Sequence, residues 1–191
     1  FIRKKFSVYA NYNKKKIKNK FNAKSYRPLK INLFDQKIKL PHDINSIIHM
    51  ASVTSNHTDK KTYKKNIKMT QNLANFIRQN SNIEKLIFFS SASIYSDKNC
   101  GGVNEKLYKK NQNYYAKSKY KSEMIFKKLK KIKVYNLRLP AVMGTIKEKG
   151  FLSLIIMKMK KNLNIELFNN QNKFNNVIFI NNLNKFMLNL L

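Results

Sequence analysis

Short apolar runs alternate along the chain with longer segments in which apolar residues recur at helical spacing between lysines. The apolar runs are predicted to be strands buried on both faces, because they contain few polar residues. They cover residues 7–10, 29–33, 46–51, 85–90 and 133–138. Helices are predicted between them, over 62–79 and 114–129. Strands alternating with helices favour a doubly wound, Rossmann-like α/β fold with a parallel sheet, whose ligands bind beyond the carboxyl ends of the strands.

The pattern changes after Gly144. Residues 151–157 begin a basic amphipathic segment, for which a packed helix is favoured over a helix lying on a membrane surface. Residues 177–180 are predicted to form another strand and 184–191 a final helix. We therefore expect one doubly wound domain over residues 1–146 and a second region over residues 147–191.

Lysine and arginine outnumber aspartate and glutamate by 40 to 9, which gives a formal net charge of +31. Binding to nucleic acid or to an acidic membrane is one interpretation of this charge. The lysines are spread over the whole chain, however, and no aromatic or glycine-rich recognition motif accompanies them. A bias in composition is the favoured interpretation, and nucleic-acid binding ranks last.

Cysteine use and hydropathy favour a cytoplasmic protein. The single cysteine, Cys100, excludes an internal disulfide and fits a reducing compartment. No apolar run reaches the roughly 20 residues of a membrane span. The basic residues 1–6 are not followed by a long apolar stretch, so no signal peptide is expected. A first residue other than methionine indicates a fragment.

Tyr115 and Lys119 are the first candidates for chemistry. Four residues apart on a predicted helix, they share one face. A free tyrosine has a pKa of about 10, and a nearby ammonium lowers it by stabilising the phenolate. The pair is therefore a plausible proton-transfer unit, although in a chain this rich in lysine the spacing also arises by chance.

Hydroxyl side chains follow the fourth predicted strand. Ser90 and Ser91 stand where that strand ends, at the sheet edge where ligands bind in such folds. A serine there can bind a substrate oxygen, and it can equally cap the turn. His49 ends another apolar strand, where a lone histidine is more often structural than catalytic. His42 and His57 belong to no cluster at ligand spacing, so no metal site is expected.

Five segments in order resemble motifs of the extended short-chain dehydrogenase/reductases, the NAD-dependent epimerase/dehydratase family. They are residues 47–52 (IIHMAS, resembling V-I-H-L-A-A), 66–73 (NIKMTQNL, resembling N-x-x-x-T-x-N-L), 90–96 (SSASIYS, resembling S-S-A-S-V-Y-G), 115–123 (YAKSKYKSE, resembling Y-x-x-S-K-x-x-x-E) and 137–144 (LRLPAVMG, resembling L-R-x-P-x-V-x-G). Five matches in the correct order are far more specific than any one of them.

The resemblance implies roles for individual residues. Tyr115 would be the general acid/base, Lys119 would bind the nicotinamide ribose and tune Tyr115, and Ser91 would orient the reacting oxygen. The residues implied in cofactor binding are Asn11, Asn32, Leu33, Met50, Ala51, Ser52, Asn66, Ser90, Tyr115, Lys119 and Pro140. NAD is the implied cofactor. NADP stays an alternative, because Asn11 stands where an NAD enzyme often has an acid.

The same resemblance implies an enzyme of nucleotide-sugar metabolism: an epimerase, dehydratase or reductase. Residues 1–146 would form part of the NAD(P)-binding domain. Residues 147–191 would form part of a small substrate-binding region intertwined with it. The glycine-rich phosphate loop and the first strand of the family are missing, so we expect a chain truncated at its N-terminus. Members often dimerise through the helix with the tyrosine motif, which makes a homodimer an expectation.

Two other functions stay open at this point. A degenerate relative that binds a ligand or a partner without catalysis is favoured if the chain is complete without the loop. A basic nucleic-acid-binding protein is the third and last. Between the enzymes, no acidic pair follows Ser91, which favours an epimerase or reductase over a dehydratase.

Overall fold

The computed structural model describes residues 6–12, 26–35, 37–54, 59–95, 113–144, 151–165 and 177–191. The chain divides into two compact units, Phe1–Arg138 and Leu139–Leu191. The elements of the first unit, in order, are β1 (Val8–Tyr12), β2 (Tyr26–Lys30), β3 (Ser46–His49), α1 (Lys60–Gln79), β4 (Lys85–Ser91), the 3-10 helix η2 (Ala92–Tyr95), α2 (Tyr114–Phe126) and β5 (Lys133–Leu139), whose last residue begins the second unit.

Parallel strand pairs form the sheets of the first unit. β1 pairs with β2, and β3, β4 and β5 are neighbours in that order in a three-stranded sheet. β3 runs parallel to β4, with Ile47 beside Leu86 and His49 beside Phe88. This register brings the carboxyl ends of β3 and β4 to the same edge of the sheet, where ligands bind in doubly wound folds.

The predicted strands and helices are present, with shifted ends. β2 begins at Tyr26, three residues before the predicted strand, because Tyr26 already pairs with Val8. The pattern misses this start because Pro28 has no N–H for a ladder and argues against a strand. α2 ends at Phe126 rather than at Leu129, whose N–H instead donates to the carbonyl of Phe126 in a turn.

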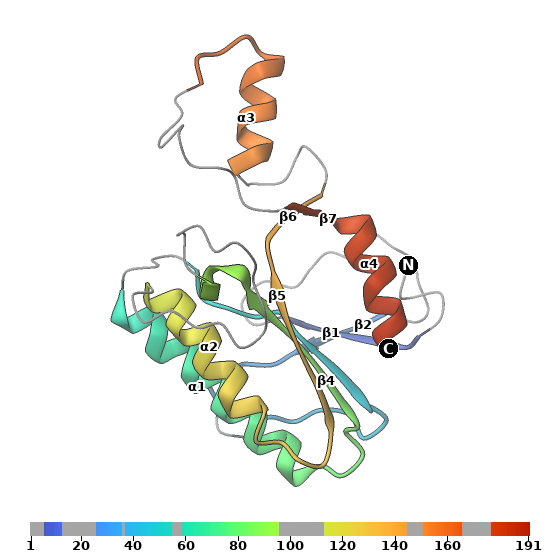
Figure 1. Cartoon of the computed structure of the whole chain (residues 1–191). Coiled ribbons are helices and arrows are strands. Elements are labelled where there is room, and N and C mark those ends of the chain that lie inside the picture. Colours follow the sequence, from blue (N-terminus) through green and yellow to red (C-terminus); the bar gives the residue numbers. More distant parts are fainter. Residues whose placement is uncertain are drawn as a thin grey trace. The chain divides into compact units, whose positions relative to one another are not determined.

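Side-chain caps start the two long helices of this unit. The carboxylate of Asp59 accepts the N–H of Lys61 at 2.7 Å, and the side-chain oxygen of Asn113 accepts the N–H of Ala116 at 2.8 Å. Such caps satisfy backbone donors that the helix leaves open. α1 buries a stripe at three- and four-residue spacing: Thr62, Asn66, Met69, Thr70, Leu73, Ala74 and Ile77. Figure 1 shows α1 and α2 side by side along one face of the sheet.

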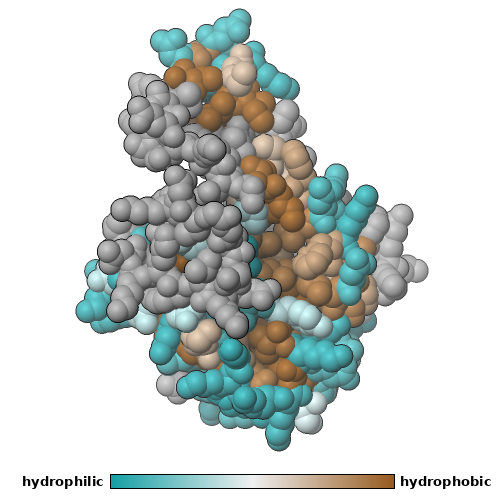
Figure 2. Space-filling view, in the orientation of Figure 1, coloured by the Kyte–Doolittle hydropathy of each residue, from teal (hydrophilic) through white to brown (hydrophobic). Residues whose placement is uncertain are grey.

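The core lies between these helices and β4. Phe88 of β4 and Phe126 of α2 are fully buried, with their ring centroids 5.1 Å apart at 65°. Edge-to-face aromatic pairs of this kind contribute about 0.5–1.5 kcal/mol beyond the area they bury. The contact fixes α2 against the strand that ends at Ser91. Lysines lie on the other side of α1, where Figure 2 shows hydrophilic residues.

The second unit contains β6 (Ala141–Met143), α3 (Phe151–Lys160), β7 (Val177–Phe179) and α4 (Ile180–Leu190). β6 and β7 are parallel, and α4 buries Leu183 and Met187. The boundary between the units falls at Arg138, and the predicted domain boundary after residue 146 stays a prediction. Among the helices of the described ranges, none is long and apolar enough to span a bilayer.

Candidate active site

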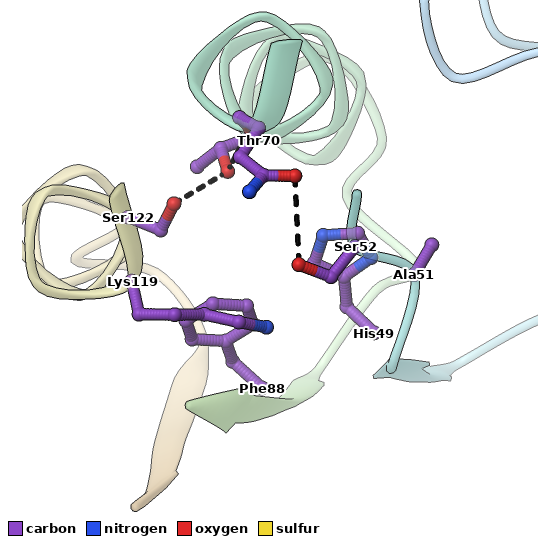
Figure 3. Close-up of a pocket in the computed structure, with 8 residues that line it drawn as sticks. His49, Ala51, Ser52, Thr70, Phe88, Lys119 and Ser122 are labelled. Carbon is purple, nitrogen blue, oxygen red and sulfur yellow. Dashed lines mark hydrogen bonds between the residues drawn. The ribbon is translucent and has the colours of Figure 1, made fainter. Parts of the chain in front are cut away.

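A small pocket lies at the carboxyl ends of β3 and β4, against α1 and α2 (Figure 3). Its lining is largely polar and comes from four elements and the loop after β3: His49, Ala51, Ser52, Asn66, Thr70, Phe88, Lys119 and Ser122. These residues meet because the register of the sheet brings the ends of β3 and β4 side by side. The predicted residues Ala51, Ser52, Asn66 and Lys119 therefore meet at one place, although the sequence separates them by up to 68 positions, from 51 to 119.

Asn66 links the loop after β3 to both helices. Its side-chain oxygen accepts the N–H of Val53 at 2.8 Å and the hydroxyl of Ser52 at 3.5 Å. Its amide nitrogen donates to the carbonyl of Val53 at 3.2 Å and to the hydroxyl of Ser118 at 3.1 Å. One turn further along both helices, Thr70 and Ser122 share a hydrogen bond of 2.7 Å. The part-buried bonds of Asn66 to Ser52 and Val53 hold the loop that carries Ser52 in one conformation, and the buried bonds to Ser118 and between Thr70 and Ser122 join the two helices beside it.

Lys119 places a buried ammonium at this pocket. The side chain is 4% exposed, and its Nζ donates to the carbonyl of Phe89 at 2.7 Å. Nζ also lies 4.8 Å from the ring centroid of Phe88 and 5.6 Å from that of Tyr115. Burial lowers its pKa to about 8. An ammonium has three donors, and the carbonyl of Phe89 is its one hydrogen-bond acceptor among the described residues. The other two N–H groups have no hydrogen-bond acceptor among the described residues.

The pKa of the Tyr115 phenol is raised, because burial disfavours the phenolate. A hydrogen bond with the side chain of Ser52 acts in the opposite direction and is outweighed. The lowering that the sequence predicts from the nearby ammonium is wrong for this structure. At neutral pH Tyr115 therefore holds its proton, which suits an acid that donates it to a reacting oxygen.

His49 lines the pocket with a buried side chain and is neutral. Its ring stacks on Phe88 at 5.5 Å and meets Phe126 edge-on at 5.8 Å. Burial lowers its pKa to about 3, with a further lowering from the charge of Lys119. These contacts favour the structural interpretation of this histidine. Within the described ranges, no group of three or more histidine, cysteine, aspartate or glutamate side chains could hold a metal ion.

The two serines at the end of β4 have different partners. The hydroxyl of Ser90 is buried and donates to the carboxylate of Glu123 at 2.5 Å. The hydroxyl of Ser91 bonds with that of Ser93 at 2.8 Å and accepts the N–H of Ser93 at 3.2 Å. Ser93 is the only hydrogen-bond partner of the Ser91 hydroxyl among the residues that the structure describes. Ser91 is half-buried at the sheet edge, whereas the hydroxyl of Ser90 is turned into the protein.

Three of the residues predicted to bind the cofactor, Asn11, Asn32 and Leu33, make their contacts elsewhere in the fold. The side-chain oxygen of Asn11 accepts the N–H of Ile31 at 3.0 Å. Asn32 donates to Asp35 at 2.8 Å, in the turn that follows β2. The side chain of Leu33 packs against the hydrophobic core. They lie by the other sheet, at the carboxyl ends of β1 and β2, and are not part of the pocket.

Five further predicted residues do not line the pocket either: Met50, Ser90, Ser91, Tyr115 and Pro140. Met50 directly follows β3 and is 61% exposed. Pro140 belongs to the second unit. The roles implied for these residues stay predictions.

Sequence reasoning gave no role to several residues of the site. Ser118 and Ser122 lie four positions apart on α2, and so do their partners Asn66 and Thr70 on α1. Small polar residues at this spacing on both helices are the signal that could have found them. Glu123 and Arg138 stand inside the quoted motifs, but their contact is not visible in the sequence.

The parallel α/β fold has a polar pocket at the carboxyl ends of β3 and β4, and comparison with known proteins gives its family. Residues 2–191 match the model of the NAD dependent epimerase/dehydratase family. The chain belongs to this family. A comparison with curated proteins gave no significant match.

Several solved structures are similar to the chain. An enzyme of Bordetella bronchiseptica, WbmH, in complex with NAD+, has a TM-score of 0.78 at 14% identity, over 98% of this chain and 64% of that chain. The UDP-N-acetylglucosamine 4-epimerase of Methanobrevibacter ruminantium M1, in complex with UDP-N-acetylmuramic acid, has a TM-score of 0.78 at 17% identity, over 94% and 63%. The UDP-glucuronic acid 4-epimerase of Bacillus cereus, in complex with UDP-glucuronic acid and NAD, has a TM-score of 0.69 at 18% identity, over 86% and 55%.

These similarities confirm the predicted Rossmann-like α/β fold. The chain spans less than two thirds of the length of each of these structures.

Proposed function

We propose that this chain carries the cofactor site and the catalytic residues of an NAD-dependent epimerase that acts on a nucleotide sugar. The single observation that carries the proposal is the buried ammonium of Lys119 beside Tyr115, at the carboxyl ends of β3 and β4. Family membership supports it, as do structural neighbours that are nucleotide-sugar epimerases, some in complex with NAD.

The residues of the pocket suit a dinucleotide. Two donors of Lys119 are available for ribose hydroxyls, and burial of the ammonium strengthens such bonds. Ala51 and Ser52 are small, so a flat ring can approach the backbone there. When bound, NAD would supply hydride transfer to and from a sugar carbon.

The chain's own residues would provide the proton chemistry. In the oxidising step Tyr115, as the phenolate, would take the proton of the sugar hydroxyl while the hydride leaves the sugar carbon, and in the reducing step it would return that proton, with Ser52 as its hydrogen-bond partner. The positive charge of Lys119 would stabilise the phenolate in the step in which Tyr115 has lost the proton. Ser91, at the end of β4, would orient the reacting oxygen.

The full-length protein that contains this chain provides the test. It is incubated with UDP-sugars and either NAD or NADP, and the 4-epimers are quantified by chromatography. We expect turnover with NAD, and a loss of about 10²- to 10⁴-fold in Tyr115→Phe, because the proton transfer is removed.

Tyr114→Phe is the matched control on the same helix. The ring of Tyr114 contacts Tyr63 and Lys117, and phenylalanine keeps these contacts. We expect this variant to retain wild-type turnover. Full activity of Tyr115→Phe, or no turnover of any UDP-sugar by the wild type with either cofactor, would contradict the proposal.

A further inference from the structure

We infer that the buried ion pair of Glu123 and Arg138 is a positioning device that aligns the helix of Tyr115 and Lys119 with the strand end of Ser91. The inference rests on the proposed function. It concerns two residues that lie outside the pocket and that the proposed chemistry does not use.

The pair lies at the junction of α2, β4 and β5. Nε and Nη2 of Arg138 donate to the two carboxylate oxygens of Glu123, at 3.0 and 2.8 Å. The Glu123 side chain is 3% exposed and that of Arg138 11%. The same carboxylate accepts the hydroxyl of Ser90, and the guanidinium lies 4.9 Å from the ring centroid of Tyr95. One carboxylate thus ties α2 to β5, to the end of β4 and, through Arg138, to η2.

The place of Glu123 on α2 makes this contact relevant to the site. Tyr115, Lys119 and Glu123 follow at four-residue spacing, so they lie along one face of the helix. Ser90 directly precedes Ser91 in β4. Lys119 contacts the carbonyl of Phe89, and Glu123 contacts the hydroxyl of Ser90. Two hydrogen bonds to neighbouring residues of β4 therefore hold α2, with Tyr115 and Lys119, against the strand end of Ser91. The second of these bonds, to Ser90, requires Glu123.

Stability by itself does not explain a charged pair in this place. Taking two charges out of water costs free energy, and apolar side chains of similar volume often replace a buried ion pair without loss. A bidentate guanidinium–carboxylate contact differs from an apolar contact in fixing both distance and orientation. Because reacting groups displaced by about 1 Å can lose about 100-fold in rate, such a constraint is valuable beside a catalytic site.

Two variants of the full-length protein separate positioning from stability. Glu123→Gln is expected to lower kcat about 100-fold, to leave the KM for the UDP-sugar within about threefold, and to weaken NAD binding about tenfold. The double variant Glu123→Leu/Arg138→Met is expected to regain the wild-type Tm while kcat stays low. Leu129→Ala, in the hydrophobic core, is the control: it lowers the Tm and leaves kcat and NAD binding unchanged.

A double-mutant cycle keeps the inference testable if the apolar pair does not fold. Ser90→Ala removes only the hydroxyl that Glu123 accepts. If Ser90 acts through Glu123, Ser90→Ala lowers kcat in the wild type and has no further effect in Glu123→Gln. A kcat that returns together with the Tm in the apolar double variant would overturn the inference, and so would additive effects in the cycle.

The titration of NAD separates the two proposals. A wild-type protein that binds NAD without turning over any UDP-sugar contradicts the proposed function alone. Weaker NAD binding by Glu123→Gln in that protein still supports the positioning role, and unchanged binding overturns it.

Discussion

Burial of Lys119 predicts that methionine at this position stabilises the protein while it removes activity. The pKa of the ammonium is lowered from 10.5 to about 8, because burial disfavours the charged form. This difference corresponds to about 3 kcal/mol of unfavourable charge burial at neutral pH. Methionine loses the hydrogen bond to Phe89 and the charge on the ring of Phe88, which together contribute about 1–2 kcal/mol. Lys119→Met is therefore expected to raise the free energy of unfolding by about 1–2 kcal/mol at pH 7.

The stability gained by Lys119→Met depends on pH, and the lowered pKa of Lys119 determines the direction of this dependence. In the unfolded chain Lys119 titrates near 10.5, and in the folded protein near 8. Between these values the unfolded chain holds a proton that the folded protein has lost, so the wild type gains stability from this group as the pH rises. Above both values the penalty is gone. The advantage of Lys119→Met is thus largest below pH 8 and shrinks towards pH 10.5.

Urea denaturation at pH 7 and at pH 10 measures both statements. Lys117→Met is the matched control, because it removes the same charge from a half-buried position on the same helix. This control measures how much the loss of any one lysine stabilises the protein by reducing charge repulsion in a chain of net charge +31. A Lys119→Met variant less stable than the wild type at pH 7 would refute the reasoning, and so would an advantage that is the same at both pH values.

Two further predictions concern the buried polar residues around the pocket. Asn66→Ala is expected to lower the free energy of unfolding by about 2–4 kcal/mol, because it leaves the part-buried bond to Val53 and the buried bond to Ser118 unmade. Denaturant titration checks this against Asn75→Ala on the exposed side of α1, a variant that is expected to change the free energy of unfolding by less than about 0.5 kcal/mol. His49 has its pKa lowered from 6.5 to about 3, so the unfolded chain takes up this proton first and stability is lost as the pH falls through that interval. His49→Phe keeps an aromatic ring there, and Tm measured against pH is expected to fall less steeply below pH 6.5 than in the wild type.

The sequence by itself determined the order of strands and helices and the first candidates for chemistry. Apolar runs and helical periods are local properties, and they predicted every strand of the β3–β4–β5 sheet to within a few residues. The four-residue spacing of Tyr115 and Lys119 is local as well, so their common helix face could be predicted. Motif order raised this spacing above chance, and the family match agrees with it.

Only the tertiary structure decided what each side chain of the site does. Ser90 and Ser91 are neighbours of one type, yet Glu123, 33 positions from Ser90, takes the hydroxyl of one and not of the other. The pKa of Tyr115 is raised rather than lowered, because burial depends on the whole packed core. The common helix face of Tyr115 and Lys119 was visible in the sequence. Its surroundings were not, because they depend on contacts between residues far apart in the chain and on the desolvation that packing causes.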